Sequence, residues 1–201
     1  MEQDLKEKYK EYREALLKEC QWLNSSIYLF RRIIDRKEDM PRAYKIAPHF
    51  FGMVLHSLES NIIISSFKLF DRCGQRGFFN YLRFIESNIP LFSKLYMGRS
   101  ISKEVIELDR KSILELEALE NIKTRRDKIH THLDKKYFTD RDKLHDETPI
   151  KWEDFGKIQK LMDEILVKYS VAFDGNQYSI DFVNMNDVDR IFKEIQNNQK
   201  D

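Results

Sequence analysis

Apolar residues recur every three or four positions along most of this 201-residue chain, the spacing that places them on one face of an α-helix. The pattern predicts a first long helix from Asp4 to about Arg36. A second helix is predicted to end near Asp71, and Pro41 and Pro48 mark the interruption between the two.

The next interruptions are short. Residues 72–77 contain two glycines and are predicted to form a loop. Asn80 is expected to cap a third helix, which Pro90 bends or splits and Gly98 closes. Loops of this length favour helices packed against their neighbours in the chain.

Helical periodicity returns after residue 100 and then stops. Ser100 or Ser102 is predicted to open a fourth helix that leads straight into a polar segment beginning at Lys123. Residues 139–149 are polar and predict an exposed loop, and residues 177–183 are interpreted as a brief strand.

The remaining periodic segments are a fifth helix from Trp152 to a stop at Asp174-Gly175 and a short final helix around residues 188–195. The sequence therefore predicts an all-α protein, an up-and-down bundle of about five or six helices. One domain is expected over residues 1–201, divided into a bundle with a polar motif at its end (1–138), an exposed loop (139–150) and C-terminal helices (151–201).

Composition supports this interpretation and narrows the function. Six Gly and four Pro are few for this length, and 41% hydrophobic residues are enough for a core. The net charge of +1 gives no overall attraction to nucleic acid or membrane, so any basic surface must be local. Cys20 and Cys73 are expected to be packing residues, and the absence of a disulfide framework favours the cytoplasm.

The most apolar stretch, residues 50–70, contains His56, Glu59 and Lys68, which would be costly at bilayer depth. It is predicted to be a buried core helix. The N-terminus lacks the apolar core of a signal peptide, so a cytoplasmic location without a membrane partner is expected.

Candidate chemistry concentrates in one segment. Between Lys123 and Lys143, eight Lys and Arg oppose four Asp, a local net charge of +4. Guanidinium groups suit phosphate and imidazoles transfer protons near neutral pH, so this composition suits phosphodiester chemistry without requiring a metal.

Helical geometry leaves the pairing of these groups open. Arg125 and His132 are seven residues apart and share a face, and Arg126 and His130, four apart, share another. Arg126 and His132 lie about a third of a turn apart on an ideal helix, so they converge only at a helix end, a kink or a dimer interface.

Arg126-Asp127-Lys128-Ile129-His130-Thr131-His132 resembles the signature of the HEPN superfamily, an Arg followed by a polar residue and, four to six positions from the Arg, a His. The string from Arg126 to Lys135 is most similar to the abortive-infection (AbiU-type) branch. The upstream helix, which opens with His49-Phe-Phe and ends in Lys68-Leu-Phe-Asp-Arg72, is also similar, so the resemblance spans roughly residues 41–138.

The resemblance implies a metal-independent endoribonuclease without a cofactor, in which His132 is the general base or acid and Arg126 stabilises the phosphate. Asp127 completes this catalytic set by orienting one of them. Arg125, His130 and Asp134 are accessory candidates, because Arg125 and His130 also satisfy the spacing. Candidate RNA-binding residues are Lys123, Lys128, Lys135 and Lys136.

Family membership would also imply partners. The expected substrate is single-stranded RNA such as an anticodon loop, the expected assembly is a homodimer with facing motifs, and an antitoxin is a further expected partner. The biological role implied is phage defence by abortive infection or a toxin–antitoxin system.

Three other interpretations stay open. The segment could be a helix end with a local Arg126–Asp127 ion pair, or a non-catalytic HEPN module that binds nucleotide, RNA or protein. Metal binding by its His and Asp residues is disfavoured, because His130 and His132 lie about 200° apart on a helix.

Overall fold

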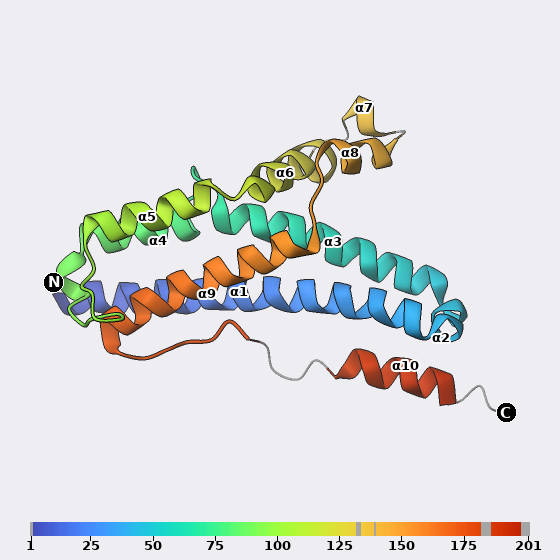
Figure 1. Cartoon of the computed structure of the whole chain (residues 1–201), viewed down its shortest axis with the longest axis horizontal. Helices are drawn as coiled ribbons and strands as arrows, with labels where there is room; N and C mark the ends of the chain where they lie inside the picture. The colour runs from blue at the N-terminus through green and yellow to red at the C-terminus, as the bar shows by residue number, and fades with distance from the viewer. Residues whose placement is uncertain (1, 132–133, 139, 182–185, 198–201) are drawn as a thin grey trace. The chain divides into compact units, whose positions relative to one another are not determined.

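The computed structural model describes residues 2–131, 134–138, 140–181 and 186–197, and these residues are almost wholly α-helical (Figure 1). The all-α prediction is confirmed. The helices are α1 (Glu2–Asp39), α2 (Pro41–Ile46), α3 (Pro48–Phe70), α4 (Phe78–Ser87), α5 (Lys103–Leu114), α6 (Glu117–Arg125), α7 (Lys135–Phe138), α8 (Arg141–Glu147), α9 (Trp152–Asp174) and α10 (Asp187–Asn197), with a 3₁₀ turn η1 (Ile89–Leu91) and a π-helix η2 (Arg126–Thr131).

Most predicted ends coincide with local signals in the structure. Pro41 lies at the start of α2 and Pro48 at the start of α3, where a missing N–H costs no helical hydrogen bond. The Ser102 hydroxyl caps α5 by accepting from the Val105 N–H, and Gly175 ends α9 with a φ of 85°.

Two predicted helices are shorter than the periodicity suggested. The third begins at Phe78, not Asn80, with Gly77 at its N-cap, and it ends at Ser87, before Pro90 enters a 3₁₀ turn. The predicted fourth helix is divided into α5 and α6 at residues 115–116. Pro90 predicted the first break, as observed, whereas apolar spacing continues across residues 115–116 and hid the second.

The loop prediction for residues 139–150 is wrong over residues 141–147, which form α8. Asp140 caps this helix by accepting from the Lys143 N–H at 3.1 Å, and Leu144 is buried. The prediction failed because α8 is mostly polar and Leu144 is its one apolar residue that is buried. Residues 177–181 form no strand, and residues 182 and 183 lie outside the described part of the chain.

The chain separates into two compact units, each assembled from distant segments. Unit 1 comprises residues 1–20 and 63–180, and unit 2 comprises residues 21–62 and 181–201. This division differs from the predicted boundaries at residues 138 and 150, because each unit combines segments that are remote in sequence.

The core of unit 1 is aromatic. The hydroxyls of Tyr9 and Tyr81 are 2.7 Å apart, and both rings are fully buried. The Tyr9 ring also packs on Phe92 and Phe173, and α9 runs along the first part of α1 (Figure 1). Asp109 lies in the same core, accepting hydrogen bonds from Lys168 and from the Tyr169 hydroxyl. These contacts join α1, α4, α5 and α9 within unit 1.

Unit 2 is organised around α10, which is strongly amphipathic. Its buried Phe192 packs on Phe51 of α3 with ring centroids 4.9 Å apart. On its polar side, the Asp189 carboxylate accepts hydrogen bonds from Arg32 and Arg36 of α1. Both arginines hold the pKa of Asp189 well below its usual range.

Helix α3 belongs to both units, and its burial changes along its length. Ile62, Ile63 and Leu69 are buried as predicted, but Phe50 and Met53 are 62% and 73% exposed. The core-helix prediction is therefore right for the C-terminal part of α3, whereas the N-terminal part buries Phe51 and leaves Phe50 and Met53 exposed. By length and composition this helix is long and apolar enough to cross a membrane, and 28% of its apolar window is buried.

Candidate functional site

The predicted motif lies where the α-helical backbone changes its winding. Helix α6 ends at Arg125, and residues 126–131 continue as the π-helix η2. Short π-helical turns are rare and are found frequently at functional sites, because they re-aim the side chains that follow. The angular relations of an ideal α-helix therefore do not hold from Arg126 onwards.

Arg125 is held within the protein by backbone contacts. Its Nε and Nη2 atoms donate to the carbonyl oxygen of Thr148 at 2.9 and 2.7 Å. Thr148 is buried and precedes α9, so Arg125 ties the end of α6 to the segment between α8 and α9. Both of these donors are engaged by the Thr148 carbonyl.

Arg126, the next residue, faces a different environment. Its guanidinium carbon lies 3.4 Å from the centroid of the Phe67 ring, a cation–π stack. Its Nη2 atom is 2.6 Å from the Asp127 carboxylate, and the arginine side chain is 24% exposed. This Arg126–Asp127 ion pair is the contact expected both of an orienting carboxylate and of a plain helix end.

Arg126 lines a cavity of about 360 Å³ in unit 1. The cavity is open enough to admit a ligand group, and its polar walls carry both signs of charge. They are contributed by the end of α3, the loop that follows it, α6 and η2: Asp71, Arg72, Cys73, Glu120, Lys123 and Arg126. Three cations around a small cavity suit an anionic ligand such as a phosphate.

Two predicted residues cannot be placed in this cavity from the structure. His132 lies outside the described residues, as does the side chain of His130, although the backbone of His130 belongs to η2. Their roles stay predictions. The structure supplies the position of the Arg126 half of the motif.

Asp134 and Lys128, an accessory candidate and an RNA-binding candidate, form an ion pair of 2.8 Å. The hydrogen bond from Lys128, together with one from the Lys136 N–H, lowers the pKa of Asp134. The same contact raises the pKa of Lys128. Asp134 is therefore a stable carboxylate and is poorly suited to donate a proton.

The other candidate lysines differ in their availability. Lys136 donates to Glu147 and to the Tyr137 hydroxyl, and the Glu147 contact raises its pKa. Lys123 is 3.7 Å from Glu120 at the cavity, and Lys135 is exposed. Lys123 is thus the only one of the four candidates that lines the cavity with Arg126.

Phe67 and Arg72 are site residues that sequence reasoning missed. The Phe67 ring stacks on the Arg126 guanidinium. The Arg72 Nη2 atom lies 3.9 Å from the Glu120 carboxylate at the same cavity. The signal was present, because the family resemblance covered both the end of the upstream helix and the motif. The structure brings these two stretches to one cavity.

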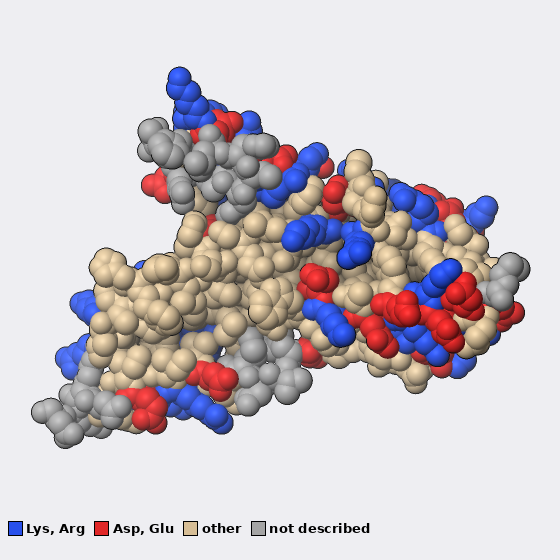
Figure 2. Space-filling view, turned by 180° about the vertical axis from the view of Figure 1, so that it is seen from behind, with Lys and Arg blue, Asp and Glu red and all other residues tan. Residues whose placement is uncertain are grey.

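Charge over the surface is mixed. Lys and Arg are interspersed with Asp and Glu on the face shown in Figure 2, in keeping with the net charge of +1. Among the residues that the structure describes, no group of three or more His, Cys, Asp and Glu is arranged to hold a metal ion. The Arg126 cavity carries three cations, Arg72, Lys123 and Arg126, beside the carboxylates of Asp71 and Glu120.

The helical architecture and the arginine at the helix end fit the expected HEPN class, and comparison with known families shows the membership. The chain matches the AbiU2 family over residues 6–195 and belongs to that branch of the HEPN superfamily. This family is associated with abortive-infection defence against phage. The match extends beyond the predicted residues 41–138 at both ends. No curated protein and no solved structure matches the chain.

Proposed function

We propose that this protein is a metal-independent endoribonuclease that cleaves single-stranded RNA loops, such as anticodon loops, during phage defence. The observation that carries the proposal is the position of Arg126. Its guanidinium is stacked on Phe67, tethered by Asp127 and set in the wall of a cavity with Arg72 and Lys123. Preorganised cations of this kind stabilise charge that develops on a phosphate.

The reaction would use the RNA's own 2′-hydroxyl as nucleophile. His132 would accept the 2′-hydroxyl proton as the oxygen attacks the adjacent phosphorus, and the 5′-oxygen of the next nucleotide would leave after gaining a proton. The products would be a 2′,3′-cyclic phosphate and a 5′-hydroxyl. Arg126 would neutralise the extra negative charge on the phosphoryl oxygens in the transition state.

Asp127 and Phe67 would act through Arg126. The Asp127 carboxylate pairs with one edge of the guanidinium, and the Phe67 ring stacks on its face. The guanidinium donors would therefore be oriented before substrate binds. An oriented arginine loses less conformational entropy when the transition state forms. We propose a homodimer as the active assembly and an antitoxin as its regulator, both on the basis of family membership.

The test is RNA cleavage in excess EDTA. Purified protein, Arg126→Ala and His132→Ala would be incubated with total bacterial RNA, and new RNA ends would be mapped. We expect wild-type cleavage that survives EDTA, leaves cyclic phosphates and falls at least ~100-fold in each variant. The control is Arg83→Ala, which removes an exposed arginine of α4 and should cleave like wild type.

Other outcomes have definite meanings. Cleavage that persists in Arg126→Ala would discard the site assignment. A folded wild-type protein that binds RNA without cutting it would favour the non-catalytic binding module. Sedimentation velocity on the same samples tests the dimer, because a monomer that cleaves RNA would remove the need for facing motifs.

A further inference from the structure

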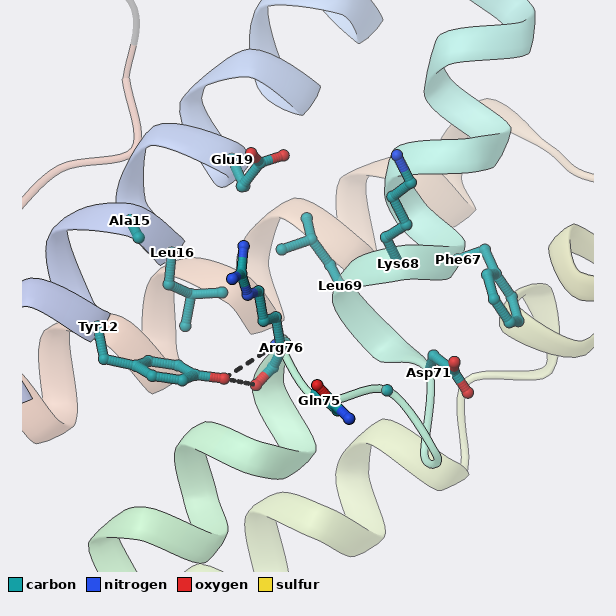
Figure 3. Close-up of a pocket in the computed structure, with 12 residues that line it drawn as sticks. Tyr12, Ala15, Leu16, Glu19, Phe67, Lys68, Leu69, Asp71, Gln75 and Arg76 are labelled. Carbon is teal, nitrogen blue, oxygen red and sulfur yellow. Dashed lines mark hydrogen bonds between the residues drawn. The ribbon is translucent and has the colours of Figure 1, made fainter.

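A second, larger cavity of about 640 Å³ lies in unit 1 between α1 and the loop that follows α3 (Figure 3). Nothing in the HEPN signature involves it. Its walls are partly apolar and partly charged, and the residues that define it are Tyr12, Leu16, Glu19, Lys68, Leu69 and Arg76. We call it the Arg76 cavity.

The framework of the Arg76 cavity is fixed by hydrogen bonds. The Tyr12 hydroxyl donates to the Gly77 carbonyl and accepts from the Gly77 N–H, both at 3.0 Å (dashed lines in Figure 3). Gly77 has a φ of 132°, and a Cβ there would be 2.6 Å from the Leu69 carbonyl oxygen. Only glycine lets the loop approach α3 this closely, so the cavity wall is a built feature.

Two cations belong to this cavity. Arg76 comes from the loop and Lys68 from α3, and both side chains extend toward the side on which Glu19 lies (Figure 3). Both residues are exposed, and within the described part of the chain neither forms an ion pair. Their positive charges are therefore available to a ligand.

The Arg76 cavity adjoins the Arg126 cavity. Phe67 and Asp71 line both, and the Phe67 ring carries the Arg126 guanidinium. Asp71 is engaged in the loop, where its carboxylate accepts from the Cys73 N–H at 3.1 Å. An RNA strand with one phosphate at Arg126 would pass over Phe67 to reach Lys68 and Arg76.

We propose that the Arg76 cavity binds one nucleotide of the RNA strand flanking the cleaved bond, an inference that rests on the proposed ribonuclease function. Lys68 and Arg76 hold the phosphate of that nucleotide through charge-assisted hydrogen bonds. Its base lies against the apolar wall formed by Leu16 and Leu69. The cavity volume of about 640 Å³ leaves room for a nucleotide.

Glu19 gives the site a preference among bases. Its carboxylate lies on the side of the cavity toward which Lys68 and Arg76 extend, where it can accept hydrogen bonds from a base edge. The amino groups of adenine, cytosine and guanine can each donate to a carboxylate, whereas uracil offers only its N3–H between two carbonyl oxygens that the carboxylate repels. The cavity should therefore disfavour uridine at this position.

The test separates binding from cleavage. The probe is a fluorescein-labelled, 2′-O-methylated RNA decamer, which lacks the 2′-hydroxyl nucleophile, and its affinity is measured by fluorescence anisotropy. Lys68→Gln/Arg76→Gln should weaken binding at least tenfold and flatten the dependence of affinity on salt. The matched control, Lys111→Gln/Lys160→Gln, removes the same charge from exposed sites of unit 1 and should change affinity less than threefold.

Each result decides between the two proposals. Equal loss in both double variants, or no loss in either, would overturn the Arg76 cavity as a subsite. If wild type cleaves RNA while the double variant keeps its affinity and KM, the subsite fails and the ribonuclease stands. If the double variant loses affinity but wild type cleaves no RNA, the cavity binds RNA and the ribonuclease proposal fails.

The base preference has its own readout. Glu19→Gln should bind an all-uridine decamer and an all-adenosine decamer with closer affinities than wild type does. An unchanged ratio of the two affinities would remove Glu19 from the site.

Discussion

Arg13 and Arg126 are chemically alike and lie in contrasting regions of unit 1. Each is paired with an aspartate and stacked on an aromatic ring: Arg13 on Tyr178 at 4.1 Å, and Arg126 on Phe67 at 3.4 Å. Arg13 is 3% exposed, and its aspartate, Asp174, lies 161 residues away on α9. Arg126 is 24% exposed, lines a cavity and pairs with its neighbour Asp127.

The contrast distinguishes an arginine that joins distant segments from one that lines a cavity. The Arg13 ion pair joins α1 to the end of α9, so its contacts stabilise the fold. The Arg126 ion pair is with its neighbour in the sequence, and we expect its removal to cost less folding energy. Its guanidinium is oriented toward a space that a ligand can enter. The arginines therefore predict opposite responses to mutation.

The largest expected effect is on stability. Arg13→Ala leaves Asp174 without its main partner inside unit 1 and should lower the free energy of unfolding by about 3 kcal/mol. Urea unfolding followed by circular dichroism measures this. RNA cleavage by the fraction still folded should be unchanged at low temperature. A loss below 1 kcal/mol would contradict the structural role.

Arg125→Ala should have the next largest effect. It removes charge-assisted hydrogen bonds to the Thr148 carbonyl, which is buried, and should cost about 2 kcal/mol of stability. The same urea titration measures the loss. Full stability with abolished cleavage would instead make Arg125 the motif arginine, and the Arg126 assignment would be wrong.

Arg126→Lys sharpens the comparison by keeping the charge. Lysine lacks the planar fork that stacks on Phe67 and donates twice to a phosphate, so kcat should fall at least ~10-fold while the melting temperature stays near that of wild type. Initial rates on a defined RNA loop, combined with thermal melts, measure both. Arg13→Lys is the control, because it should lower the melting temperature rather than the kcat of the folded protein.

Phe67→Leu tests the platform beneath Arg126. Leucine preserves most of the apolar volume but removes the cation–π contact, so kcat/KM should fall roughly threefold. The double variant with Arg126→Ala should lose no further activity, because the ring acts through the arginine. Additive losses would show that Phe67 contacts RNA directly.

The smallest effect concerns acid stability. Burial alone would raise the pKa of Asp174, but hydrogen bonds from the Asn176 N–H and from Arg13 lower it below its ordinary value. A lowered pKa adds stability above the unfolded value of about 4, and this contribution is lost as pH falls through the folded pKa. Unfolding midpoints of Asp174→Asn should therefore depend less on pH below about 5 than those of wild type. Parallel pH profiles would exclude Asp174 as a source of acid sensitivity.

The sequence determined much of this fold and half of the site. Apolar periodicity, proline positions and capping residues are local signals, and they located α1, α3, α9 and the start of α5 to within a few residues. The motif from Arg126 to Lys135, with the upstream helix end, pointed to the HEPN superfamily and its abortive-infection branch. These properties depend on residues close together in the chain, which is why the sequence alone reveals them.

Only the tertiary structure shows the different surroundings of Arg125 and Arg126, which are adjacent and chemically identical. Arg125 meets the Thr148 carbonyl, and Arg126 meets Phe67 and lines a cavity. Those partners lie 23 and 59 positions away in the chain. Helix α8, the π-helical turn and the Arg76 cavity likewise arise from packing between distant segments, and no local pattern encodes such contacts.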